Sequence, residues 1–188
     1  STQEFVISHS SSDIPRCGWV GDDPLMIRYH DDEWGVPVHD DAKLFELLTL
    51  EGAQAGLSWR TVLHKREGYR KLFKNFDPRK VARFTSEDVE RLMADASIIR
   101  NRLKIESTIS NARAVLAMAE QHGSFDAYIW AFVEGQPIIN RFKKLTDLPA
   151  RTELSDRMRK QMERDVFRFG GSTVIYAFFY AVVLRNDH

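Results

Sequence analysis

The residues of this sequence with the clearest potential for chemistry lie in the segment Leu50–Trp59, which reads LEGAQAGLSW. The carboxylate of Glu51 follows an apolar stretch and precedes two glycines and the indole of Trp59. Such a group could recognise a flat, polar ligand that is held against an aromatic face. The alternative is a helix that simply ends near Gly52 and leaves Glu51 exposed to solvent. The segment alone leaves both interpretations open.

Two earlier segments combine aromatic, acidic and potential metal-ligating residues. They are Arg16–Val20 (RCGWV) and Tyr29–Pro37 (YHDDEWGVP), and together with Leu50–Trp59 they hold three of the four tryptophans. One cysteine and two distant histidines, Cys17, His30 and His188, lack the spacing typical of a zinc site. The residues by themselves therefore make a poor case for a metal.

A further group of candidate residues surrounds a pair of glycines near the C-terminus. Residues 155–164 read as a helix, 166–171 as a tight connection and 172–184 as a strongly apolar second helix. In such a helix-hairpin-helix pattern the backbone at Gly170, Gly171 and Ser172 could approach and bind a phosphate. The flanking cations Lys160, Arg164 and Arg168 would add attraction to a DNA backbone. A plain bend between two core helices is the alternative.

Composition limits the kinds of partner and the compartment. Lys plus Arg and Asp plus Glu both total 27, so any contact with nucleic acid must come from a local basic patch. Arg100, Arg102 and Lys104 are either such an edge or ordinary solvated helix charges. Cys17 is the only cysteine, and no apolar stretch follows a basic start as in a secretory signal. We expect a cytoplasmic monomer with no membrane span.

Helix signals recur along the chain whereas period-two alternation is absent, so we expect an all-α fold. Asp40 is a possible N-cap of a helix that stops near Gly52, and a second helix is expected from about Ser58. These two helices would place Glu51 at the end of one element and Trp59 at the start of the next.

Further helix boundaries follow from cap signals. The signals are Asp77-Pro78, an N-cap with proline at the first helical position; Thr85 with Asp88, a capping box; Gly123, which ends the apolar stripe from Ile105 to Ala119; and Ser124, which caps a helix running to Gly135. Residues 136–152, with two prolines, are the most loop-like interior segment. We expect a flexible arm over 1–15 and a single helical domain over 16–188, with the hairpin at about 155–184.

The ordered set of motifs resembles the 3-methyladenine DNA glycosylase I family. The resemblance is carried by the three N-terminal segments and by Phe167-Arg168-Phe169, Gly171, Thr173 and Asn186-Asp187-His188. It runs from about Arg16 to the end of the chain, and such a series is far more specific than any one motif. The family belongs to the helix-hairpin-helix DNA glycosylases. The resemblance therefore implies two helical lobes around a base-binding pocket, with DNA anchored by the C-terminal hairpin.

The resemblance also implies a way of reaching the damaged base. Damaged double-stranded DNA is the expected partner, and a base inside a duplex must be extruded before an enclosed pocket can hold it. By similarity, Glu51 accepts hydrogen bonds from the alkylated adenine, while Tyr29 and Trp59 supply polar and aromatic contacts. Trp19 and Gln54 are weaker candidates for the pocket wall.

The implied chemistry is hydrolysis of the N-glycosidic bond of 3-methyladenine. An N3-methylated adenine nucleoside is positively charged, so it attracts an ionised carboxylate and an electron-rich ring. Its base is already a good leaving group, and the enzyme need only stabilise an oxocarbenium-like sugar as water attacks. Because the resemblance suggests no Schiff-base lysine, we expect a monofunctional glycosylase of base-excision repair.

The family is known for a structural zinc ion that joins the N-terminal region to the C-terminus through two cysteines and two histidines. Cys17, His30 and His188 match three of these ligands, and the fourth would lie beyond His188, the last residue of the sequence. The resemblance thus implies a structural zinc whose fourth ligand is not in this sequence.

Three residues depart from the family's pattern. Met26 stands where an aromatic residue is expected, and Val166 and Val183 each replace a glycine. These changes bear on the shape of the pocket and the geometry of the hairpin.

The alternative function is a catalytically inactive, DNA-binding helix-hairpin-helix relative. A third interpretation is a metal-stabilised helical interaction module with neither DNA binding nor a base-sized pocket.

Overall fold

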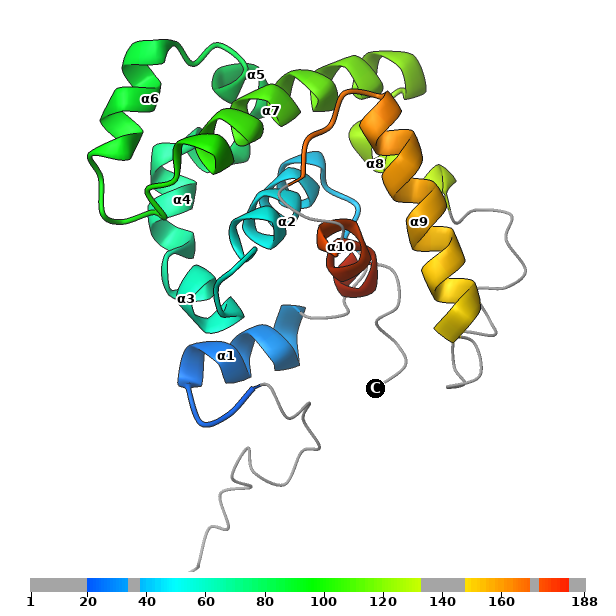
Figure 1. The fold of residues 1–188 in the computed structure, drawn as a ribbon, viewed down its shortest axis with the longest axis horizontal. Coiled ribbons are helices and arrows are strands. Elements are labelled where there is room, and N and C mark those ends of the chain that lie inside the picture. Colours follow the sequence, from blue (N-terminus) through cyan, green and yellow to red (C-terminus); the bar gives the residue numbers. More distant parts are fainter. Residues whose placement is uncertain (1–19, 34–37, 133–147, 170–172, 183–188) are drawn as a thin grey trace, which may run out of the picture.

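A computed structural model describes residues 20–33, 38–132, 148–169 and 173–182, and every regular element in these ranges is a helix (Figure 1). The expected all-α class is confirmed. In the same ranges, no helix combines the length and apolar character needed to cross a membrane. The expected arm over 1–15 lies outside the described residues. So do Cys17, Trp19, Gly170, Gly171, Ser172, Val183 and His188.

The elements follow the chain in a simple order. They are α1 (Pro24–Arg28), the π-helix η2 (Tyr29–Glu33), α2 (Asp41–Ala53), α3 (Trp59–His64), α4 (Arg66–Leu72), the 3-10 turn η3 (Lys74–Phe76), α5 (Pro78–Val81), α6 (Ser86–Met93), α7 (Arg102–His122), α8 (Phe125–Ala131), α9 (Leu148–Arg164) and α10 (Val174–Val182).

The N-cap residues predicted from the sequence lie at the starts of the corresponding helices. The Asp40 carboxylate accepts the Lys43 N–H at 3.1 Å at the start of α2, and the Ser58 hydroxyl accepts the Thr61 N–H at 3.2 Å at the start of α3. Asp77, the Thr85 capping box and Ser124 act in the same way for α5, α6 and α8. These side chains satisfy backbone donors that have no partner inside the helix.

One predicted loop was too long. The loop-like segment was expected to run from 136 to 152, but α9 begins at Leu148. Pro149 lies in its first turn, where a missing N–H costs no hydrogen bond, so proline there is compatible with a helix start. Residues 136–147 lie outside the described part of the chain.

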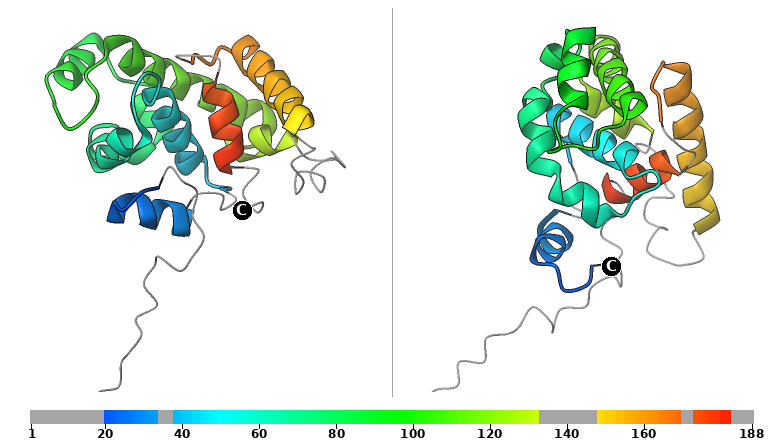
Figure 2. Two further views of the ribbon diagram at one scale, coloured as in Figure 1. Left: turned by 60° about the horizontal axis from the view of Figure 1, so that its bottom comes forward. Right: turned by 60° about the vertical axis from the view of Figure 1, so that its left-hand side comes forward.

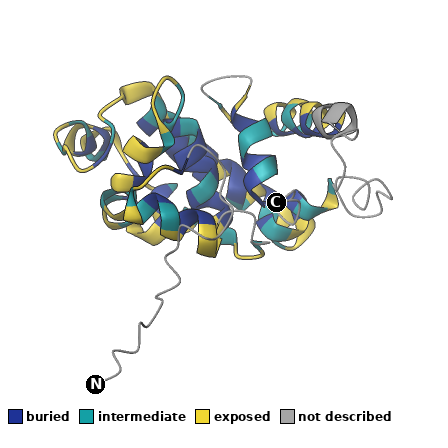
Figure 3. Ribbon diagram, turned by 90° about the horizontal axis from the view of Figure 1, so that it is seen from below, coloured by how far each residue is buried: buried dark blue, intermediate teal, exposed yellow. Residues whose placement is uncertain are grey.

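Helix α2 lies at the centre of the described fold. It contacts α7, α8 and α10, and α10 in turn contacts α9 (Figures 1 and 2). Buried residues gather in the interior of the ribbon, as Figure 3 shows, and the fully buried side chains include Phe45, Phe178 and Phe179. Burying each such ring contributes about 2 kcal/mol. The tightly packed core therefore holds α2 and α10, the two helices that border the site, in fixed positions.

A smaller apolar cluster forms beside this core. Val20, Met26, Tyr29 and Leu63 are its buried members. Trp59 packs against both this cluster and the main core. The candidate functional residues come together at the junction between the two clusters.

Candidate active site

A cavity of about 440 Å³ opens where α1, η2, the end of α2, the start of α3 and α10 meet. It is lined by Met26, Tyr29, Glu51, Gln54, Ser58, Trp59, Arg60, Tyr176, Ala177 and Tyr180. Four of the residues singled out in the sequence, Tyr29, Glu51, Gln54 and Trp59, thus share one cavity. Its volume suits a ligand the size of a nucleobase or somewhat larger.

Glu51 is buried, with only 7% of its surface exposed, so the interpretation of a solvent-exposed helix end is wrong. Burial raises the pKa of Glu51 to about 8, because desolvation disfavours the charged carboxylate. Its place in the last turn of α2, near the negative end of the helix dipole, also disfavours a negative charge. At neutral pH the neutral acid is therefore favoured. An incoming positive charge would favour the ionised form that was expected from the sequence.

Tyr29 and Trp59 form an aromatic corner beside this acid. Their ring centroids are 5.1 Å apart and the planes are inclined by 49°. Burial and the nearby Glu51 raise the pKa of Tyr29 well above its ordinary value, so its hydroxyl remains a hydrogen-bond donor. The indole Nε1–H of Trp59 is buried and has no hydrogen-bond partner among the described residues. A buried donor of this kind is costly unless a ligand supplies an acceptor.

Asp23 connects α1, which leads directly into Tyr29, to α3, which begins with Trp59. Its carboxylate caps α1 by accepting the Leu25 N–H at 2.9 Å. It also accepts a hydrogen bond from His64 and pairs with Arg60, both of α3, at 2.5 and 2.9 Å. The His64 hydrogen bond in particular lowers the pKa of Asp23 to about 2. The ionised carboxylate of Asp23 therefore helps to fix the position of Tyr29 relative to Trp59.

Sequence reasoning missed both α1 and the contribution of α10. Asp23-Pro24 carries the same N-cap and proline signal that located α5, and it would have found α1. Tyr176 and Tyr180 lie four residues apart on one face of the apolar α10 and line the cavity. That spacing was a signal for a shared face, but only the tertiary packing of α10 against α2 turns the face toward Glu51.

Met26 lies in the cavity wall and is buried. Its unbranched thioether is flexible and polarisable, so it can adapt to a ring in place of the expected aromatic residue. The departure at Met26 therefore leaves the wall of the cavity apolar.

His30, one of the predicted metal ligands, lies in the π-helix η2 directly after Tyr29. Its ring is buried, and Nδ1 lies 3.1 Å from the Asp31 carboxylate. A carboxylate beside one ring nitrogen is the usual arrangement around a histidine that binds a metal through the other. His30 therefore fits a zinc ligand. No cluster of three or more possible ligands occurs among the described residues, which do not include Cys17 and His188.

The hairpin lies between α9 and α10, which pack against each other. The side chains of Lys160, Arg164 and Arg168 are exposed there, as DNA-contacting cations would need to be. Val166 has a φ of +71°, a left-handed conformation that strongly favours glycine. The geometry thus explains why glycine is usual at this position and shows that the valine is accommodated with strain.

Comparisons with known proteins show which family the chain resembles. The family model for methyladenine glycosylase matches residues 19–188. DNA-3-methyladenine glycosylase 1 of Escherichia coli (strain K12) is 52% identical over 175 residues, which cover 93% of this chain and 94% of that protein. DNA-3-methyladenine glycosylase of Haemophilus influenzae is 46% identical over 173 residues, covering 92% and 94%.

Solved structures show the same similarity in three dimensions. A crystal structure of 3-methyladenine DNA glycosylase I is 53% identical with a TM-score of 0.81, covering 93% of this chain and 96% of that one. A variant of 3-methyladenine DNA glycosylase I in complex with 3-methyladenine is 32% identical with a TM-score of 0.80, covering 93% and 94%. The resemblance seen in the sequence is confirmed, and the chain belongs to the methyladenine glycosylase family.

Proposed function

We propose that this protein excises 3-methyladenine from alkylated DNA by hydrolysing the N-glycosidic bond between the base and its deoxyribose. The observation that carries the proposal is the base-sized cavity in which Glu51, Tyr29 and Trp59 meet. Relatives at 52% and 46% identity bear the name of this activity, and one solved relative holds 3-methyladenine.

The cavity is lined by side chains of several helices and lies beside α2 and α10, so the damaged nucleotide must leave the base stack to enter it. The ring pair of Tyr29 and Trp59 offers a stacking surface, and the Tyr29 hydroxyl and the Trp59 Nε1–H offer donors to the base edge. Gln54 adds an amide at the cavity wall. These contacts would repay part of the cost of unstacking.

The charge of the lesion gives Glu51 its role. A methylated adenine still bonded to deoxyribose is cationic, and its arrival favours loss of the Glu51 proton, because opposite charges attract strongly in a desolvated cavity. The carboxylate then holds the cationic base. When the glycosidic bond breaks, its electron pair stays on the base, which leaves neutral. Water adds to the sugar carbon and loses a proton, so the net reaction is hydrolysis.

A monofunctional mechanism is consistent with the composition of the wall. None of the described residues lining the cavity is a lysine, and a Schiff-base route needs a lysine amine within reach of the sugar.

DNA anchoring is assigned to the hairpin in this proposal. Lys160, Arg164 and Arg168 would contact phosphates of damaged duplex DNA. The backbone of Gly170, Gly171 and Ser172 would bind a further phosphate at the start of the second helix. The exposure of the three cations supports this assignment.

A structural zinc is also part of the proposal. Cys17, His30 and His188 would be three of its ligands, and the buried His30 beside Asp31 supports it. We further propose that the protein acts as a monomer in the cytoplasm, a reducing compartment in which the single Cys17 forms no disulfide.

The proposed activity is tested by incubating the protein with methylated duplex DNA and detecting the released bases by mass spectrometry. We expect free 3-methyladenine to accumulate in proportion to time and enzyme. Absence of release by folded, zinc-supplemented protein would contradict the proposal. Duplex binding that is the same with and without a lesion would then identify an inactive DNA-binding relative.

A further inference from the structure

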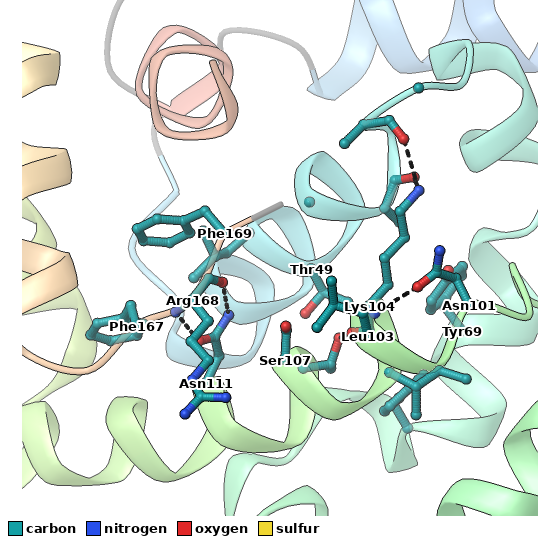
Figure 4. A pocket seen from close by; sticks show the side chains of 18 of the residues that line it. Thr49, Tyr69, Asn101, Leu103, Lys104, Ser107, Asn111, Phe167, Arg168 and Phe169 are labelled. Carbon is teal, nitrogen blue, oxygen red and sulfur yellow. Dashed lines mark hydrogen bonds between the residues drawn. The ribbon is translucent and has the colours of Figure 1, made fainter. Parts of the chain in front are cut away.

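A second hollow, of about 680 Å³, lies between the end of α2, the first half of α7 and residues 167–169 of the hairpin (Figure 4). It therefore separates the two parts of the molecule that the proposed function uses, the base cavity and the hairpin. Helix α7 runs along it from one part to the other. At each end of the hollow, one side chain of α7 forms two hydrogen bonds to backbone groups of a neighbouring segment.

At one end, Lys104 holds the turn that follows the base-binding helix. Its ammonium donates hydrogen bonds to the carbonyl oxygens of Ala53 and Ala55 at 2.9 and 2.8 Å. These two residues flank Gln54, which lines the base cavity. The last carbonyls of a helix lack partners within it and carry partial negative charge, so a cation is a strong cap. Lys104 thus holds the connection between Glu51 and Trp59 from outside the base cavity.

At the other end, Asn111 holds the backbone of the hairpin. Its Nδ2 donates to the Arg168 carbonyl at 2.9 Å, and its Oδ1 accepts the Arg168 N–H at 2.8 Å (Figure 4). Asn111 is itself buried, with 6% of its surface exposed. Both backbone groups of Arg168 are therefore fixed while its side chain stays exposed for other contacts.

Lys104 and Asn111 are seven residues apart, so they lie on the same face of α7, about 10 Å apart along its axis. Contacts with α2, α5, α6 and α8 hold α7 itself in the core. We propose that α7 is a brace that sets the separation between the base cavity and the DNA-anchoring hairpin, with Lys104 and Asn111 as its two positioning residues. The inference rests on the proposed function, since it takes Glu51 to bind the base and the hairpin to bind DNA.

The brace matters because the extruded base and its neighbouring phosphates belong to one strand. A hairpin that is displaced from the cavity by even 1 Å would misplace the glycosidic bond, an error that can cost about 100-fold in rate. Neither positioning residue needs to touch the base for this effect.

The brace predicts that loss of its two contacts has separable effects on binding. Lys104→Met keeps the approximate length of the side chain but removes its hydrogen-bond donors. Asn111→Leu keeps the approximate volume of the side chain but removes both hydrogen bonds to Arg168. Two affinities are measured by titration calorimetry: that for free 3-methyladenine, which needs only the cavity, and that for an undamaged duplex, which needs only the hairpin. We expect Lys104→Met to weaken base binding about tenfold and leave duplex binding unchanged, and Asn111→Leu to do the converse.

Both variants should also release 3-methyladenine from methylated DNA more slowly than wild type. Lys104→Arg, which retains donors for both carbonyls, should restore much of the base affinity. Arg113→Met is the matched control, because Arg113 of α7 also donates to a backbone carbonyl, that of Ala82, at 3.1 Å but faces neither site. It should leave both affinities unchanged. If Asn111→Leu does not fold, Asn111→Asp replaces it, since it keeps the acceptor and loses the donor.

Lys104→Met and Asn111→Leu variants that weaken both affinities alike, or neither, would overturn the brace. The proposed function fails in a different pattern. If the hairpin does not anchor DNA, Lys160→Ala combined with Arg164→Ala leaves duplex binding unchanged. If the cavity does not bind the base, Trp59→Ala, which removes the aromatic ring from the lining, leaves binding of free 3-methyladenine unchanged. Either result removes the premise of the brace as well, whereas normal behaviour of these variants confines a failure to the brace.

Discussion

The buried carboxyl of Glu51 is the residue on which the account of the site depends most. In the proposed function this group carries a negative charge during the reaction, yet its burial disfavours that charge when no cation is bound. The arrangement gives the cavity a preference for a cationic base, since a neutral base offers no charge to offset the loss of the proton. It also means that the protein gives up folding stability to keep this acid in position.

This loss of stability should be measurable as a function of pH. The pKa of Glu51 is about 8 in the folded protein and about 4.5 when unfolded, so the folded state is penalised as pH rises from about 4.5 to about 8. Glu51→Gln should therefore raise the free energy of unfolding by up to about 3 kcal/mol at neutral pH and by little at pH near 4.5. Urea unfolding at both pH values checks this. A gain that is equal at the two values would contradict the cause.

Local sequence signals and family motifs identified Tyr29, Glu51, Gln54 and Trp59, and the structure brings all four into one cavity. They could be found because they lie in short, unusual segments. Tyr176 and Tyr180 could not be found in that way, because their contribution depends on how α10 packs against a helix more than 100 residues earlier. The protonation state of Glu51 was likewise beyond the sequence, since it follows from the degree of burial.

Among the elements, the helix starts were the most predictable feature. Asp40, Asp77 and Thr85 each form the side-chain cap that their sequence context indicates, because capping is decided within a few residues. The start of α9 was misplaced because the two prolines suggested a longer loop, although Pro149 is compatible with a first turn. Element type was therefore accessible from local chemistry, and some element boundaries were not.

The hairpin offers a test at the scale of one element. Val166 is 63% exposed and has a φ of +71°, so its side chain contributes little packing while its backbone is strained. Val166→Gly should raise the free energy of unfolding by about 1 kcal/mol, because glycine adopts this conformation without a steric penalty. Val166→Ala serves as the control, since it keeps a Cβ and should gain less. A Val166→Gly protein that unfolds more easily than wild type in urea would show that the strain is not relieved.

At the scale of the whole molecule, three parts of the chain must be held together: the N-terminal segment with Tyr29 and His30, the central α2 with Glu51, and the C-terminal hairpin. The core around α2 and α7 fixes the last two. Asp23 fixes the first through its contacts with α3. The proposed zinc would add a further connection, between Cys17, His30 and His188.

If the proposed zinc is bound, its removal should affect the fold before the chemistry. Dialysis against a chelator is expected to lower the melting temperature and to make the N-terminal segment more susceptible to proteolysis. Base release per folded molecule should change little below the new melting temperature, because His30 does not line the base cavity. Metal content measured by mass spectrometry supplies the control. A purified protein that carries no zinc and is unaffected by the chelator would contradict the proposed site.

The central claim is that Glu51, ionised as the cationic base arrives, holds 3-methyladenine for excision. It is tested most directly by single-turnover release of 3-methyladenine from methylated duplex DNA by wild type, Glu51→Gln and, as the matched control, Glu106→Gln on the exposed face of α7. We predict that Glu51→Gln slows release about 100-fold while Glu106→Gln does not. A Glu51→Gln protein that releases the base at the wild-type rate would contradict the account.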